Sequence, residues 1–324
     1  MRNPFDLAIL RAVMQRRSVQ LLLRLIQGGI VALVLYYISA ELAQIGWQDV
    51  WQSMPTSPWF YLLFVAMYFA LPIGEWLVYQ ILWGREMRRR FGLFLRMRVY
   101  NYALVSYAGE AFLALWAHKN LGHPGRSIVS AIKDSNVLSA FASNSFTIIL
   151  LAGFFFTGQL ERLTDADPDF GNYIGFSLVI GLVLLPLMLK FRGKILALPA
   201  PQAKRIFLIH LSRLVLVLLL QAGQWAVVLP EVAFNTWILL LTAQMVLTRV
   251  PFLPNTDLLF AGLGITLMGY VEGPDVIIAG MFLASGALSQ LLNLAAFLIT
   301  SLEHKRAPIP APTGGKKLAA GTRT

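Results

Sequence analysis

The chain has 324 residues, of which 57% are hydrophobic and only 13% are charged, and its mean hydropathy is +0.65. Soluble globular domains carry about 25% charged residues, so this composition excludes that class and indicates a protein that crosses a membrane several times. We interpret the net charge of +11 as basic loops that face the cytoplasm and anionic lipid headgroups, not as a nucleic-acid surface. The absence of cysteine excludes disulfides and thiolate metal sites.

The chain divides into a basic start, a long apolar region and a polar end. Residues 1–20 are rich in arginine and predict a cytoplasmic N-terminal segment, followed by a first helix that is retained and not cleaved as a signal peptide. Residues 21–302 predict one transmembrane domain. Residues 303–324 are rich in Pro, Gly, Ala and Lys and predict a disordered basic cytoplasmic tail.

Nine apolar runs lie within the central region, and their lengths predict membrane helices. No run shows the alternating pattern of a membrane β-barrel, so the expected fold class is an all-α polytopic membrane bundle. The runs are 21–40, 58–83, 99–117, 135–158, 173–190, 206–229, 234–250, 256–271 and 275–301.

The distribution of basic residues predicts the topology. If run 99–117 enters the membrane and returns while the other runs cross it, every one of the 27 basic residues except Arg162 lies on the cytoplasmic side or at a membrane end there. We therefore expect about eight crossings plus one re-entrant or interrupted segment, with both termini in the cytoplasm. Under this topology Trp225 and Trp237 belong to an outer aromatic belt, and His210 lies at a membrane end.

Run 99–117 contains polar residues that are unfavourable in contact with lipid. In "NYALVSYAGEAFLALWAHK" the carboxylate of Glu110 follows Asn101 and Tyr107, and Gly109 permits a turn or a close backbone approach. A re-entrant segment that lines a hydrated cavity would lower the free energy of placing these groups in the membrane. An interfacial helix from which Glu110 reaches water is the alternative.

Glu75 lies deeper in an apolar run, eight residues before Trp83 in "FALPIGEWLVYQILW", where Pro72 and Gly74 are expected to disturb the helix. Arg213 lies eight residues after Arg205, at a similar expected depth. We therefore expect an ion pair between Glu75 and Arg213. The alternative is that each side chain extends separately to the membrane surface.

Further charged residues lie near the ends of later runs. In "VPFLPNTDLLFAGLG", Pro254 and the preceding Pro251 prevent a continuous helix, and Asp257 is expected in the first turn of a new one, as a capping residue, a substrate ligand or both. Lys133 and Arg249 are candidates for contact with an anionic headgroup, although a lone interfacial lysine is more often a topological anchor. We find no nucleotide-binding, hydrolase or metalloprotease motif, and no metal or cofactor is expected.

Three segments resemble the transmembrane region of lysylphosphatidylglycerol synthases and the wider flippase-like family, which includes hopanoid-associated membrane proteins. They are "VYNYALVSYAGEAFLA", "IVSAIKDSNVLSAF" and "VPFLPNTDLLFAGLGITLMGY". The positions that match the family pattern are Asn101, Gly109, Glu110, Pro254 and Asp257. The chain departs from it at Leu113, where an arginine is common after Gly-Glu, and "SYAGE" lacks the usual Pro-Gly. The resemblance implies a lipid as the substrate.

Together these features predict a multi-pass protein of the bacterial inner membrane that transports or presents an amphiphilic lipid through a polar groove. The expected substrate-binding residues are Glu75, Asn101, Tyr107, Gly109, Glu110, Arg213, Pro254 and Asp257. Membrane lipids are the expected partners, with lipid-biosynthetic enzymes or a second copy of the chain as further candidates. A membrane-embedded lipid-modifying enzyme and a noncatalytic scaffold for lipid-biosynthetic enzymes are the alternative functions.

Overall fold

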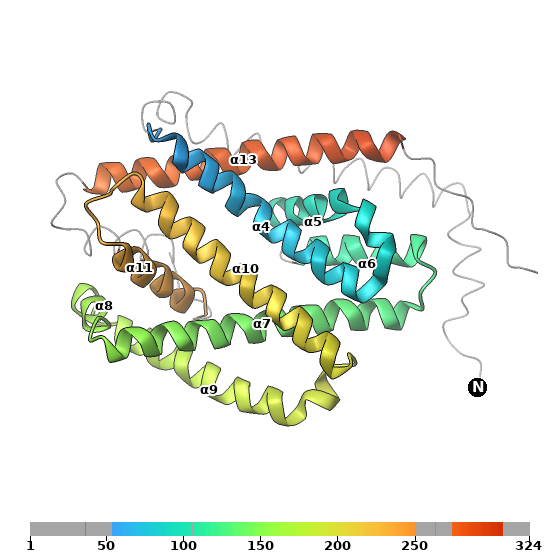
Figure 1. The fold of residues 1–324 in the computed structure, drawn as a ribbon, viewed down its shortest axis with the longest axis horizontal. Helices are drawn as coiled ribbons and strands as arrows, with labels where there is room; N and C mark the ends of the chain where they lie inside the picture. The colour runs from blue at the N-terminus through green and yellow to red at the C-terminus, as the bar shows by residue number, and fades with distance from the viewer. Residues whose placement is uncertain (1–35, 37–53, 105–106, 250–262, 264–273, 307–324) are drawn as a thin grey trace, which may run out of the picture.

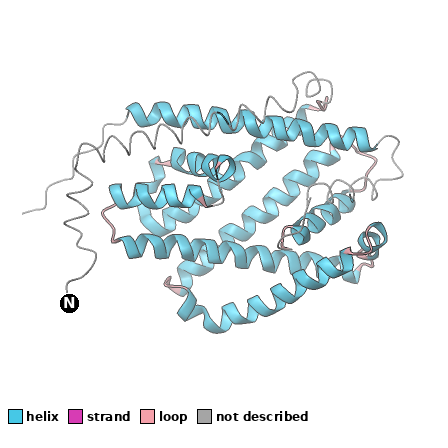
Figure 2. Cartoon of the chain, turned by 180° about the vertical axis from the view of Figure 1, so that it is seen from behind, coloured by secondary structure: helices cyan, strands magenta, loops and turns pink. Residues whose placement is uncertain are grey.

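The computed structural model describes residues 36, 54–104, 107–249, 263 and 274–306. Every regular element in these residues is a helix, and none is a strand (Figure 2). The expected all-α class is therefore confirmed for the described part of the chain. In chain order the elements are α4 (Pro58–Trp83), η1 (Gly84–Arg89), α5 (Phe91–Ala103), α6 (Ala108–Asn120), α7 (Gly125–Phe156), α8 (Glu161–Ala166), α9 (Phe170–Ile195), α10 (Ala200–Ala226), α11 (Phe234–Leu247) and α13 (Pro274–Arg306).

Five of the described helical segments are long and apolar enough to cross a membrane, which supports a multi-pass membrane protein. They are Pro58–Arg89, Gly125–Phe156, Phe170–Ile195, Ala200–Ala226 and Gly280–Leu302. The shorter helix α11 is also apolar but has 14 residues. The predicted runs 21–40 and 256–271 lie outside the described residues except for residues 36 and 263, so the expected number of crossings and the sides of the two termini stay predictions.

The apolar runs predict most helix positions well, although some helices begin earlier than their runs and α4 differs at Pro72. Helix α5 begins at Phe91, eight residues before run 99–117. Helix α7 begins at Gly125, ten residues before the predicted run, because Ile128 and Ile132 in its first turns pack into the second apolar cluster. Helix α4 continues through Pro72, where we expected a disturbance. A proline removes one backbone hydrogen bond, and the packing of both flanks of α4 is sufficient to keep the helix continuous here.

Helix α10 packs against both α4 and α7, and it runs alongside α4 but crosses α7 at an angle (Figure 1). The short helices α5 and α6 pack against each other, α5 also contacts α4 and α13, and α6 also contacts α7. Helix α11 packs against α10, α7 and α9. Two of the helices that pack against α10, α4 and α7, are thus distant from it in the sequence.

Two large apolar clusters form the core of the described part. One contains Phe60, Leu218 and Trp225, and the other contains Val78, Phe94 and Ile206. Trp225 and Trp237 are 2% and 1% exposed, and their ring centroids lie 5.5 Å apart. The prediction that they form an outer aromatic belt is therefore wrong, because the turn between α10 and α11 folds both indoles into the first cluster.

Candidate functional site

The structure brings together Glu75 and Arg213, which are 138 residues apart in the chain. Arg213 donates a hydrogen bond of 2.6 Å from Nη1 to Oε1 of Glu75, and 10% and 13% of their respective side-chain surfaces are exposed. The predicted ion pair is confirmed. Arg213 lies at the centre of α10, thirteen residues from either end of that helix. The pair therefore joins α4 to α10 deep within the bundle.

Small residues of α4 and α7 make room for this pair. A Cβ atom on Gly74 would lie 2.7 Å from Cδ of Arg213, so a larger side chain at position 74 would displace the arginine stem. From the other side, Arg213 Nη2 donates a hydrogen bond of 3.3 Å to Oγ of Ser139 on α7. The packing of Arg213 thus explains why position 74 is a glycine, which the sequence pattern alone did not show.

Serines of α7 contact three basic side chains in succession. Ser135, Ser139 and Ser143 are four residues apart and share one face of the helix. Ser135 Oγ lies 3.2 Å from Nε2 of His210, Ser139 contacts Arg213, and Ser143 Oγ accepts a hydrogen bond of 3.0 Å from Arg249. We call these three serines the α7 serine row. Their spacing is visible in the sequence, but the sequence does not identify which residues they contact.

The serine row lies in a polar layer between the two apolar clusters. Along α10, Leu218 belongs to the first cluster and Ile206 to the second, while His210 and Arg213 lie between them. His210 is 0% exposed and lies inside the bundle, and its expected position at a membrane end stays a prediction. Ser135 is also buried, and a Ser-His pair without an opening to a substrate does not support a catalytic nucleophile.

The predicted interruption of run 99–117 is present. Helix α5 ends at Ala103, α6 begins at Ala108, and each has 13 residues, or about 20 Å, which is shorter than the hydrocarbon layer. The Gly109 amide donates a hydrogen bond of 2.6 Å to Oδ1 of Asn101. A Cβ atom on Gly109 would clash with the carbonyl oxygen of Met97 and lie 2.9 Å from Asn101 Oδ1. Asn101 and Gly109 therefore hold α5 and α6 together as a hairpin, and their contact with a substrate stays a prediction.

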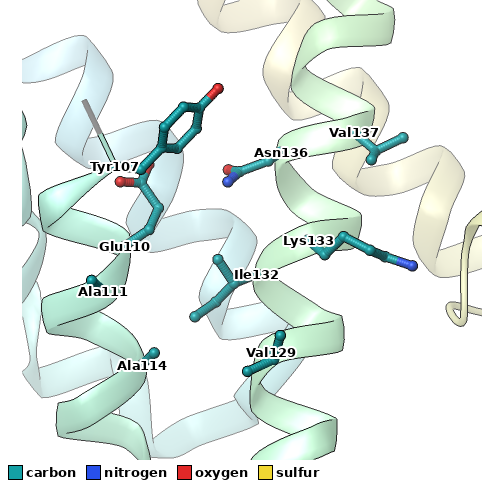
Figure 3. A pocket seen from close by; sticks show the side chains of 9 residues that line it. All are labelled: Tyr107, Glu110, Ala111, Ala114, Val129, Ile132, Lys133, Asn136 and Val137. Carbon is teal, nitrogen blue, oxygen red and sulfur yellow. The ribbon is translucent and has the colours of Figure 1, made fainter.

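A groove of about 440 Å³ lies between α6 and α7 (Figure 3). Its walls are mainly apolar, and they include Ala111 and Ala114 from α6 and Ile132 from α7. The polar side chains in its lining are Tyr107, Glu110, Lys133 and Asn136, and Asn136 is directed towards α6. The groove thus places a carboxylate and an amide next to apolar walls.

One oxygen of the Glu110 carboxylate, Oε2, is buried without a hydrogen-bond partner among the described residues. Glu110 also lies close enough to Glu75 for their two negative charges to interact. Tyr107 precedes it with φ of 69° and ψ of 6°, and its side chain is 66% exposed at the edge of the groove. A left-handed conformation is rare for a tyrosine and places the start of α6 next to the groove.

The two headgroup-contact candidates are engaged with the protein. Figure 3 shows the Lys133 side chain directed away from Glu110, and its Nζ donates a hydrogen bond of 2.5 Å to the Ile195 carbonyl and pairs with Asp134 at 3.0 Å. Arg249 donates to Asn144 Oδ1 and to backbone carbonyls of Ser143 and Met245, at 2.8 to 3.0 Å. Most of the Arg249 donors are thus used within the protein, and a headgroup contact by either residue stays a prediction.

Pro254 and Asp257 lie outside the described residues. Within the described ranges, no group of three or more His, Cys, Asp or Glu side chains has the geometry to hold a metal ion.

Sequence reasoning missed two polar groups that the structure shows. Asp134 is fully buried, and its Oδ2 accepts hydrogen bonds from the amides of Ala197 and Leu198 at 2.8 and 3.1 Å. The Arg98 guanidinium lies 4.2 Å from the ring centroid of Tyr68, whose hydroxyl donates to Oδ1 of Asn293. The "KD" pair of residues 133 and 134 looked like an interfacial anchor, and nothing in the sequence connected it to the linker between α9 and α10.

Comparison of the chain with protein-family models, with curated proteins and with solved structures finds no significant match in any of the three.

Proposed function

We propose that this protein is a lipid transporter of the bacterial inner membrane, in which a lipid headgroup passes along the α6–α7 groove while the lipid tail stays in the bilayer. The observation that carries the proposal is the buried Oε2 atom of Glu110, which has no hydrogen-bond partner among the described residues and belongs to a groove with mainly apolar walls. Polar groups in such a groove replace part of the water that a headgroup loses on entering the membrane. Asn136 would share this role from the opposite wall.

The interrupted helices support a transporter. Helices that end within the membrane are a recurring feature of transporters, because their unpaired backbone groups and polar residues face a substrate path. The α5–α6 hairpin is too short to cross the membrane as two helices and supplies one wall of the groove. The resemblance of residues 99–114 to flippase-like proteins supports a lipid as the substrate.

Glu75 and Arg213 have a supporting role in this proposal. They are paired and mostly buried, and neither of them lines the grooves described for this part of the chain. We infer that the pair holds α4 against α10 behind the hairpin, so that Glu110 can be exposed to a substrate without the bundle opening. Of the four charged residues that we expected to bind the substrate, Glu75, Glu110, Arg213 and Asp257, we therefore keep only Glu110 as a substrate ligand among the described residues.

The test is lipid translocation in proteoliposomes with a panel of labelled lipids. The native chain is compared with Glu110→Gln, which removes the charge and keeps the size, and with Glu86→Gln, a matched control on the exposed surface of η1. We expect at least one lipid to move faster than in empty vesicles, and Glu110→Gln but not Glu86→Gln to reduce that rate at least tenfold.

The outcomes separate the proposal from its alternatives. If no lipid moves faster than in empty vesicles, the transporter proposal is wrong. A chemical change in a lipid headgroup would instead favour a lipid-modifying enzyme. If substitutions of Glu75, Glu110 and Arg213 leave the cellular function intact while surface substitutions abolish it, a noncatalytic scaffold explains the protein better.

A further inference from the structure

A second groove, of about 130 Å³, lies where α7, α9 and α10 meet. It shares no lining residue with the α6–α7 groove. Its walls include Phe141 of α7, Met188 of α9 and Phe207 of α10, and the rings of Phe141 and Phe207 lie 5.3 Å apart. Arg192, near the end of α9, and Lys204, in the first turns of α10, complete the lining. We call this the α9–α10 groove.

The two cations of this groove have no acidic partner among the described residues. No carboxylate in the described part of the chain lies within ion-pair distance of Arg192 or Lys204. Asp134 is the acidic residue bound to the adjoining linker, and its carboxylate already accepts two backbone hydrogen bonds and pairs with Lys133. Two exposed cations at the edge of an apolar groove therefore present net positive charge to the surroundings.

The linker that forms the base of the groove is held in place by the protein. Asp134 binds the amides of Ala197 and Leu198, and Lys133 binds the carbonyl of Ile195. A buried carboxylate that accepts backbone N–H groups is a strong restraint. The linker thus fixes the helix ends that carry Arg192 and Lys204 before a ligand binds, and this lowers the conformational entropy lost on binding.

We propose that the α9–α10 groove binds an anionic phospholipid, with its phosphate between Arg192 and Lys204 and the start of an acyl chain against Phe207 and Met188. Charge complementarity selects the anionic headgroup, and the apolar walls select a lipid over a soluble anion. Leu187 and Leu189 are 46% and 67% exposed on α9, a helix apolar enough to cross a membrane, so acyl chains lie next to the groove. The predicted topology places this end of α9 at the cytoplasmic leaflet, where anionic lipids attract basic residues.

The test measures lipid selectivity directly and does not depend on transport. The full chain is reconstituted in phosphatidylcholine vesicles that contain a small fraction of spin-labelled phosphatidylglycerol or spin-labelled phosphatidylcholine, and the immobilised fraction of each lipid is measured by electron spin resonance. We expect the native chain to immobilise more of the anionic lipid. Arg192→Gln with Lys204→Gln should reduce this preference at least about fivefold, since each cation near an anionic surface contributes about a factor of five.

Two further variants make the test specific. Lys190→Gln with Lys194→Gln removes the same charge from the same segment, but neither residue lines the groove, so the preference should remain. Ala200→Leu fills the groove without changing charge, and it should reduce the preference as the first double variant does. Thermal unfolding of each variant in detergent checks the fold.

Four results would overturn the proposal. Three of them are equal immobilisation of both lipids by the native chain, equal loss of preference in the two double variants, which indicates diffuse charge, and an unchanged preference in Ala200→Leu. Excess glycerol phosphate is added in a final arm. If it abolishes the preference, the groove is a site for soluble anions and not for a lipid. Failure of the transport assay leaves this proposal unaffected.

Discussion

The guanidinium of Arg213 on α10 binds the carboxylate of Glu75 on α4 at 2.6 Å, at the centre of α10 and between the two apolar clusters of the bundle. Neither charge is compensated by another described group at ion-pair distance. Each side chain therefore depends on the other for its place in the membrane.

Removing one partner of this pair is expected to destabilise the protein strongly. Glu75→Ala or Arg213→Ala leaves a buried charge without its counterion, which typically costs about 3 to 5 kcal/mol. The double variant Glu75→Leu with Arg213→Met replaces both charges by apolar groups and should recover most of that loss. Thermal unfolding in detergent measures the difference. Single variants as stable as the native chain would show that both side chains find water elsewhere.

The close contact between α5 and α6 predicts that one added methyl group at Gly109 destabilises the protein. Gly109→Ala places a Cβ against the Met97 carbonyl and should destabilise the protein by about 1 to 3 kcal/mol, as overpacking does in other cores. Gly153→Ala is the matched control, because its Cβ would meet no atom within 4 Å, and alanine favours the helix. The comparison uses the midpoint of thermal unfolding. Equal midpoints would contradict the close packing of the hairpin.

Filling the α6–α7 groove should stop transport without unfolding the protein. Ala114 lines the groove, whereas the neighbouring Leu115 does not and is 73% exposed. We expect Ala114→Phe to abolish lipid translocation in proteoliposomes and Leu115→Phe to leave it near the native rate. A transport rate that is the same in both variants would mean that lipids take another path.

Asp134 is predicted to protect the linker between α9 and α10. Asp134→Ala removes the acceptor of the Ala197 and Leu198 amides, so both amides should exchange hydrogen faster, and the lost charged hydrogen bonds should lower stability by about 1.5 to 3 kcal/mol each. Hydrogen exchange followed by mass spectrometry measures the exchange rate of the linker amides. Asp165→Ala, on an exposed position of α8, is the control and should leave the linker protected.

The topology can be tested with single cysteines, because the native chain contains none. Asp165 on α8 and Lys194 near the end of α9 are exposed and lie at opposite ends of α9, which spans about 39 Å. We expect a membrane-impermeant thiol reagent to label Asp165→Cys but not Lys194→Cys in intact cells. The opposite pattern would place the basic loop outside and reverse the predicted orientation.

Local hydropathy was sufficient to locate most helices in this chain. The run 58–83 coincides with α4, and the runs 173–190 and 206–229 lie close to α9 and α10. The same reading predicted an interrupted or re-entrant segment within run 99–117 and paired Glu75 with Arg213 from their similar depths. The helix positions follow from residues within one segment, because the transfer of a helix into lipid depends on its own side chains.

The rotation of each helix about its axis could not be obtained in this way. Lys133 lines the α6–α7 groove but turns towards the α9–α10 linker, and Trp237 is buried where a lipid-facing position was expected. His210 likewise faces Ser135 in the interior. Which side of a helix faces a neighbour is determined by how side chains of separate helices fit together, and in an apolar chain with a weak polar-apolar periodicity that information exists only after the helices have packed.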